Sequence, residues 1–235
     1  MDALASGRLR PERIHQSIVK LWAAKHRLGL FQQRLVNLEE ISEQIDSPEY
    51  AELALRVAEK ALATVKNEGG VLPLRSPATT CLIALSEARN SNSGRRLLEE
   101  VLARTPKMKT LLVDPLLKPA DMVDVALQLD SCGTVVVAAF VTAASFRGEV
   151  ALPAIYTNFL DAMLATERPV VLCALGSPYV LSRFPKAAAQ VATFSTTVTS
   201  EIALVRGLYG ETPMKAKPPV SIQPPSTIQP PALLP

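Results

Sequence analysis

The sequence predicts an α/β fold, a doubly wound, mostly parallel sheet of five to six strands flanked by helices as an α/β/α sandwich and preceded by a helical arm. Two observations lead to this prediction. Short β-branched runs alternate with helix patterns between about residues 42 and 222, which is the order expected for crossover connections in a parallel sheet. The runs 134–141 and 169–174 are apolar without alternation, as in strands that are buried on both faces.

Residues 1–40 are predicted to form the helical arm. Pro11 suits the first turn of a helix and Gly29 suits its end. The apolar side chains that recur at helical spacing between them are Ile14, Ile18, Leu21, Trp22 and Leu28. This helix therefore presents an apolar face that needs a partner, supplied either by another domain or by the rest of its own domain.

Residues 41–222 are predicted to form the sandwich domain. Its first helix begins after the N-cap Ser47 and runs as far as the turn at 67–70. Strands are expected at 80–85, 110–113, 134–141, 169–174 and 191–194, with 220–222 as a candidate sixth strand at the edge. Helices are expected between them at 93–104, 119–130, 151–166 and 198–208. The last segment, 223–235, holds 5 of the 19 prolines and is predicted to be an extended, disordered tail.

Composition narrows the function classes. A net charge of +3 and an aromatic content of 5% argue against nucleic-acid binding. The longest nearly apolar stretch, 135–144, is too short to span a bilayer, and no signal peptide is recognised, so no membrane partner is expected. Cys81, Cys132 and Cys173 are widely spaced and have no histidine nearby. We expect them to be buried thiols rather than disulfide-bonded or metal-binding residues.

Ligands of open parallel sheets gather outside the carboxyl ends of the strands. The turn after the first predicted parallel strand contains a single glycine, Gly94, which lies well beyond the end of the strand. It is therefore not a glycine-rich phosphate loop, and no nucleotide or flavin cofactor is expected. Both histidines, His15 and His26, lie on the first helix, away from the sheet. A serine–histidine–acid triad is therefore not expected.

Three carboxylates remain as candidates for chemistry. Glu87, Asp114 and Glu149 each follow a predicted strand. Sequence spacing does not indicate that any two of them converge, and loop solvation or helix capping is the favoured explanation for each one. Taken alone, these residues indicate a fold and no mechanism.

Several collinear segments resemble the glycoside hydrolases of family 3. VAEKALATVKNEGGVLPL (57–74) resembles the helix and connector that open the C-terminal domain of that family, and RIHQSIVKLWAAKHRLGLF (13–31) resembles the last helix of the preceding barrel. Three further matches are ALGSPYVLSRFP (174–185), the stretches 193–195 and 203–211, and PVSI (219–222). Together the matches cover about residues 8–222.

The resemblance implies a retaining glycosidase with a barrel followed by this sandwich. The short loops resemble the β-N-acetylhexosaminidase type most closely, and β-glucosidases come next. In the family the nucleophilic aspartate lies on the barrel, as does the acid/base histidine–aspartate pair of the hexosaminidase type, and this chain contains neither segment. The glucosidase type takes its acid/base glutamate from the C-terminal domain, but the loop around 146–153 lacks the longer acidic insertion, so the role is not transferred to Glu149.

The resemblance therefore implies a glycosidase module that has no catalytic residue and no cofactor of its own. It would meet a carbohydrate through a missing or separate barrel, as a gene fragment, a split enzyme or a truncated chain would. The residues expected to face the substrate are Arg147, Glu149, Ser177 and Tyr179. The family is often exported, and the compartment stays open. Two other functions remain open, a non-catalytic interaction or sugar-binding module and a β-glucosidase-type domain, whereas the missing glycine-rich turn argues against a flavodoxin-like nucleotide binder.

Overall fold

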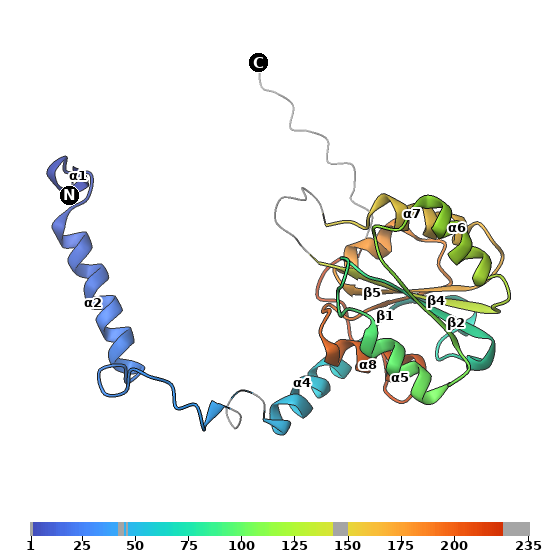
Figure 1. Cartoon of the computed structure of the whole chain (residues 1–235), viewed down its shortest axis with the longest axis horizontal. Helices are drawn as coiled ribbons and strands as arrows, with labels where there is room; N and C mark the ends of the chain where they lie inside the picture. The colour runs from blue at the N-terminus through green and yellow to red at the C-terminus, as the bar shows by residue number, and fades with distance from the viewer. Residues whose placement is uncertain (1, 42–44, 46, 143–149, 223–235) are drawn as a thin grey trace, which may run out of the picture. The chain divides into compact units, whose positions relative to one another are not determined.

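The structure is a computed structural model, and it describes residues 2–41, 45, 47–142 and 150–222 (Figure 1). The chain divides into two compact units, residues 1–50 and 51–235. The first unit contains the short helix α1 (Asp2–Ala5) and the long helix α2 (Pro11–Arg27). The second contains the sheet and the helices that cover it. No helix in the described part of the chain is long and apolar enough to cross a bilayer.

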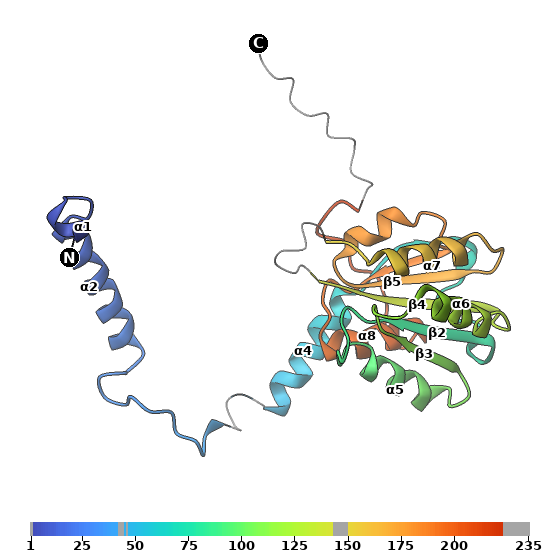
Figure 2. The same ribbon diagram turned by 45° about the horizontal axis from the view of Figure 1, so that its top comes forward.

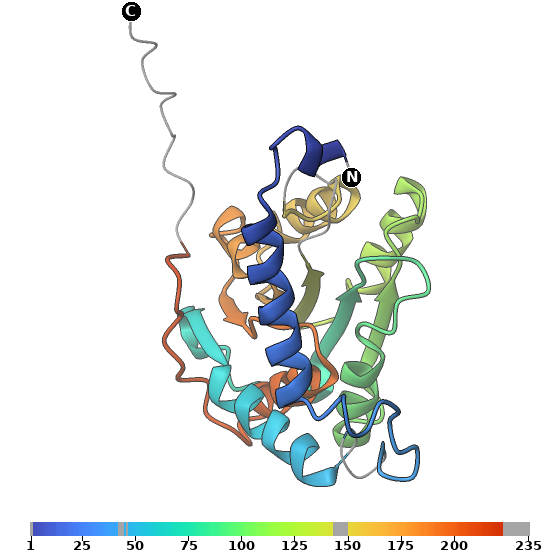
Figure 3. The same cartoon turned by 90° about the vertical axis from the view of Figure 1, so that its left-hand side faces the viewer.

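Helix α2 has the bounds that its sequence predicts. Pro11 occupies the first turn, where a missing N–H costs nothing, and Gly29 follows the helix with a positive φ of 69°. Figure 3 shows α2, in blue, as one continuous helix. None of its residues is buried, and Trp22 keeps 63% of its surface exposed. Its ring contacts that of Phe31 edge-on, with the two ring centres 6.2 Å apart.

The second unit is built on a six-stranded sheet. The strands are β1 (Ala63–Asn67), β2 (Thr80–Leu85), β3 (Lys109–Val113), β4 (Thr134–Val141), β5 (Val170–Gly176) and β6 (Ala189–Ala192). Their spatial order is β1-β6-β5-β4-β2-β3. Every neighbouring pair is parallel except β1 and β6, which are antiparallel. The predicted mostly parallel sheet is confirmed (Figure 2).

Helices cover both faces of this sheet. One face carries α6 (Pro119–Gln128) and α7 (Ala154–Leu164), and the other carries α4 (Pro48–Ala61), α5 (Arg95–Arg104) and α8 (Val198–Leu208) (Figures 1 and 2). Strand β4 shows why the sequence lacks alternation. Val135, Val137 and Ala139 belong to the core under α6 and α7, whereas Val136 and Ala138 belong to the core under α5 and α8. Because both faces are buried, both sets of side chains must be apolar.

The sixth strand is not the predicted one. The helix expected to reach residues 67–70 ends at Ala61, and 63–67 forms β1 instead. The candidate strand 220–222 forms no strand in the structure. The side of β1 that faces away from β6 contacts the chain that follows α8, where Ala63 forms an isolated antiparallel bridge with Lys215. Residues 214–216, rather than 220–222, therefore lie beside β1.

The prediction for the cysteines was wrong for two of the three. Cys81 and Cys132 form a disulfide, with their Cα atoms 5.8 Å apart, and Cys173 is a buried free thiol. The reason lies in the sheet. Cys81 lies near the start of β2, and Cys132 lies in the turn before β4, which pairs with β2 in parallel register. Neighbouring strand starts bring together two residues that are 51 positions apart in sequence.

Candidate functional site

The carboxyl edge of the sheet contains a topological switch point between β2 and β4. The chain leaves β2 for β3 on one side, then returns to form β4 on the other side of β2. Ligands of open α/β sheets commonly bind outside the strand ends at such a point, because the connections diverge there. Glu87 follows β2 at this point and Thr142 follows β4. The Thr142 hydroxyl donates a hydrogen bond to the Glu87 carboxylate.

A buried tyrosine supports this part of the edge. The Tyr156 hydroxyl, on α7, lies 3.0 Å from the carbonyl oxygen of Ser86 and 2.9 Å from that of Val113. Tyr156 therefore links the segments that follow β2 and end β3. Burial raises the pKa of Tyr156, so the phenol stays neutral and donates its proton. This residue holds the edge in place, and sequence reasoning did not single it out.

The three carboxylates that follow strands have separate roles. Asp114 accepts a hydrogen bond of 2.7 Å from the backbone N–H of Leu116, so it closes its own turn. Glu87 pairs with a hydroxyl. Glu149, like Arg147, lies outside the described residues. Within the described residues, no group of three histidine, cysteine, aspartate or glutamate side chains could hold a metal ion.

A glycine sets the backbone path after β5. Gly176 has a φ of +96°, and a Cβ there would lie 2.2 Å from the carbonyl oxygen of Val141. The next residue, Ser177, donates its backbone N–H to that same oxygen at 2.8 Å. This contact starts the 3₁₀ helix η3 (Pro178–Arg183). The predicted site residue Ser177 is half-buried here, and Tyr179, two residues further on, is 52% exposed.

Tyr179 lines a hollow of about 350 Å³, which we call the Tyr179 hollow. Its other lining residues come from the start of α7, the segment before it and η3: Val150, Ala151, Leu152, Thr157, Val180, Ser182 and Arg183. Ser177 is not among them. Sequence reasoning missed Thr157, Ser182 and Arg183. The two residues on η3 follow Tyr179 by three and four positions, which was a readable signal once a helical turn was assumed.

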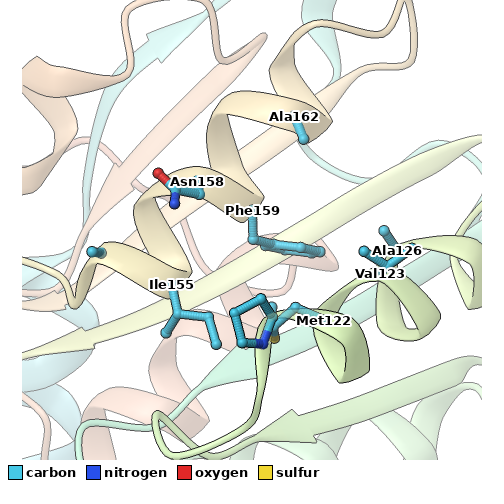
Figure 4. A pocket seen from close by; sticks show the side chains of 9 residues that line it. Met122, Val123, Ala126, Ile155, Asn158, Phe159 and Ala162 are labelled. Atoms are coloured by element: carbon cyan, nitrogen blue, oxygen red, sulfur yellow. The ribbon is translucent and has the colours of Figure 1, made fainter.

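A second hollow lies between α6 and α7 and holds about 520 Å³ (Figure 4). Its side chains are apolar apart from Asn158, and Phe159 and Met122 form much of its lining. This groove runs along the two helices, from their first residues Pro119 and Ala154 to Ala126 and Ala162. A catalytic site needs several polar groups that converge, and one amide does not supply them.

The first parallel βα junction is closed to phosphate. Glu201 on α8 is only 2% exposed and accepts backbone N–H bonds from Gly94 at 3.1 Å and from Leu97 at 2.8 Å. These two donors begin α5, where a nucleotide-binding sheet would hold a phosphate group. A carboxylate of the protein already takes that place. This arrangement argues independently against the nucleotide-binding alternative.

No protein-family model matches the sequence, and the comparison with curated proteins gives no relative. Solved structures do match. A glycoside hydrolase family 3 β-N-acetylglucosaminidase from Paenibacillus sp. str. FPU-7 shares 17% identity and a TM-score of 0.72, over 94% of this chain and 42% of that one. The β-glucoside phosphorylase BglX shares 18% identity and a TM-score of 0.70, over 94% and 40%. A β-glucosidase from Listeria innocua shares 14% identity and a TM-score of 0.66, over 90% and 32%.

The fold of the second unit is a helix-covered, mostly parallel sheet, and the matched glycosidases and glycoside phosphorylase contain the same fold. More particularly, it matches a C-terminal domain like that of the family 3 glycoside hydrolases, which confirms the resemblance at the level of the fold. The chain spans less than half the length of these solved structures.

Proposed function

We propose that this chain is the C-terminal module of a family 3 glycosidase of the β-N-acetylhexosaminidase type, and that it does not cleave glycosidic bonds alone. The observation that carries the proposal is the exposed apolar face of α2. No described residue of their own unit buries Leu21 and Trp22, although they belong to a regular amphipathic helix. An apolar face of this kind marks an interaction site, and a barrel domain is the partner that the resemblance implies.

The extent of the structural match supports the same partner. The 6% of the chain left outside the match with the Paenibacillus enzyme is about 14 of 235 residues. The first unit is longer than that, so the correspondence extends into it. Two of the matched structures are family 3 β-N-acetylglucosaminidases, with TM-scores of 0.72 and 0.71. Matched β-glucosidases have TM-scores of 0.65 to 0.68, so the hexosaminidase type is proposed first and the glucosidase type second.

The carboxyl edge explains why the chain alone is expected to be inactive. Retaining glycoside hydrolysis uses two carboxyl groups about 5–5.5 Å apart on either side of the scissile bond. In the described part of this edge, Glu87 pairs with the Thr142 hydroxyl and Asp114 closes its own turn. These residues can form a wall and hydrogen-bond a sugar. The nucleophile would come from the barrel.

The test is complementation. The purified chain should not hydrolyse a chromogenic N-acetyl-β-glucosaminide, whereas mixing it with a family 3 hexosaminidase barrel made without its own C-terminal domain and last helix should restore turnover. Replacing Leu21 and Trp22 together with serine should abolish that restoration. The matched control is the exposed apolar pair Val123 and Leu127 on α6, where a double serine variant should restore turnover fully. Turnover by the chain alone, lost in Glu87→Gln, would contradict the proposal.

A second candidate function is a non-catalytic sugar-binding module, which the exposed Tyr179 favours. It predicts saturable binding of an oligosaccharide by the chain without restoration of hydrolysis by any barrel. A parallel assay with a chromogenic β-glucoside and a glucosidase barrel separates the glucosidase type from the hexosaminidase type.

A further inference from the structure

We propose that the Tyr179 hollow is a saccharide subsite that holds one pyranose ring of an oligosaccharide against the face of Tyr179. The sugar class rests on the proposed function, and the location rests on the geometry of the hollow. Its volume of about 350 Å³ lies at the small end of ligand sites, which hold about 300–1,000 Å³. One sugar ring, rather than a cofactor, suits a hollow of this size.

The way η3 is anchored supports an outward-facing tyrosine. Pro178, Val180 and Leu181 on the same short helix are buried in the core. Tyr179, which lies between them, has more than half of its surface exposed. The neighbours of Tyr179 are therefore fixed in the core, while just over half of the surface of Tyr179 itself is free to contact a ligand. A rigid aromatic residue with a free face and a polar tip is well suited to ligand contact.

The polar groups of the hollow suit the hydroxyls of a sugar. Arg183 carries five N–H donors on a planar, permanently charged group, and its guanidinium carbon lies 5.9 Å from the centre of the buried Phe184 ring. That cation–π contact restrains the side chain beside the hollow. The Ser182 hydroxyl donates to the carbonyl oxygen of Tyr179 at 2.8 Å, which leaves its lone pairs free to accept a hydrogen bond. Thr157, only 6% exposed, adds a third polar residue to the lining.

The α6–α7 groove is less suited to a sugar than the Tyr179 hollow. It is larger than the Tyr179 hollow, but Asn158 is its one polar side chain, so a sugar placed there would lose water from its hydroxyls without replacement. In the Tyr179 hollow, apolar residues and hydroxyl- or guanidinium-bearing residues line the same space. A pyranose ring has both an apolar C–H face and a polar rim, so it matches this mixture. Position agrees with composition, because η3 follows the carboxyl end of β5.

The experiment is a titration of the full chain with N,N′-diacetylchitobiose and with cellobiose, followed by calorimetry and by saturation-transfer NMR. Tyr179→Ala should weaken the binding of the preferred disaccharide by about tenfold, which is about 1.4 kcal/mol, because it removes the ring against which the sugar packs. Tyr179→Phe keeps the ring and should stay within about threefold of the unmodified chain. Arg183→Gln should weaken binding by about threefold to tenfold through loss of charged donors.

The matched control is Tyr50→Ala, a second exposed tyrosine that lies outside the hollow. It should leave binding unchanged, and thermal unfolding should show that each variant folds. Binding of neither disaccharide, or binding that is equal in Tyr179→Ala and the unmodified chain, overturns the subsite. The complementation assay separates this outcome from failure of the proposed function. If Tyr179→Ala restores hydrolysis with an unchanged KM, only the subsite proposal is contradicted. If binding depends on Tyr179 but no barrel restores hydrolysis, only the proposed glycosidase role is contradicted.

Discussion

Helices α2 and α8 carry apolar stripes of the same kind and differ in what lies against them. In α8, seven of 11 residues are buried, whereas in α2 none of 17 is buried. The stripe of α8 packs into the core with α5 and the sheet, through Ala203, Leu204, Val205 and Leu208. The stripe of α2 keeps Leu21 and Trp22 exposed. Periodicity in a sequence therefore establishes that a helix has an apolar face, but not whether its own unit covers that face.

This difference has an energetic meaning. Fully burying a leucine side chain stabilises a protein by about 1.5–3 kcal/mol relative to leaving it in water. Helix α8 contributes this energy to the folding of the sandwich, whereas the exposed leucine of α2 contributes little of it within its own unit. The same type of residue should thus affect the free energy of unfolding strongly in α8 and weakly in α2.

The largest expected effect is a direct test of that contrast. Leu204→Ala, at a position with no exposed surface, should lower the free energy of unfolding by about 2–5 kcal/mol because it opens a cavity. Leu21→Ala, at a position that is 62% exposed, should change it by less than about 0.5 kcal/mol. Urea denaturation followed by circular dichroism measures both. Similar losses in the two variants would show that α2 is packed in the free chain and would break the comparison.

The next effect concerns a covalent link that only the sandwich has. All three cysteines lie in the second unit, and Cys81–Cys132 closes a loop with a sequence separation of 51. Replacing both with serine should lower the free energy of unfolding by about 2–4 kcal/mol, because the unfolded chain loses a constraint. Cys173→Ala is the matched control and should cost less, since it removes a single sulfur from the core. Thiol titration of the denatured, unreduced protein should find one free thiol, and three would contradict the link.

Much of the fold could be predicted because β4 and β5 are buried on both faces and must be apolar throughout. Strand β1 could not be predicted. It follows α4 directly, and Leu62 and Val65 continue the apolar spacing of that helix. Its strand character comes from pairing with β6, a contact more than a hundred residues away. The disulfide escaped for the same reason, since only the strand order makes Cys81 and Cys132 neighbours.

The candidate site was predictable to a smaller extent. Ser177 and Tyr179 were proposed from a family resemblance, and the structure places Tyr179 in a hollow but not Ser177. Thr157 could not be anticipated, because α7 and η3 meet only in the folded sandwich. The roles of Tyr156 and Glu201 could not be predicted from the residues around them, because each hydrogen-bonds to a backbone segment that is distant in the sequence.

The smallest expected effect lies in the pH dependence of stability, and it sharpens the contrast between α8 and α2. Glu201 of α8 caps the first turn of α5, a tie between helices that buries a carboxylate. Desolvation by burial raises the pKa of Glu201 above its ordinary value of 4.5, and the nearby charge of Glu99 acts in the same direction. The folded state therefore binds this proton more tightly than the unfolded state does. As pH rises through the ordinary value and then through the raised one, this residue makes the free energy of unfolding fall.

Glu201→Gln removes that titration, so the difference in stability between the two proteins should shift in favour of the variant as pH rises from 4 to 8. Arg104 lowers the pKa of Glu100 and of Glu211, and these two carboxylates act in the opposite direction, losing stability as pH falls. Both proteins retain them, so they cancel in the difference. Urea denaturation at a series of pH values measures this difference in the free energy of unfolding. If the stability curves of the two proteins stay parallel from pH 4 to 8, then Glu201 does not hold α5 through a buried charge.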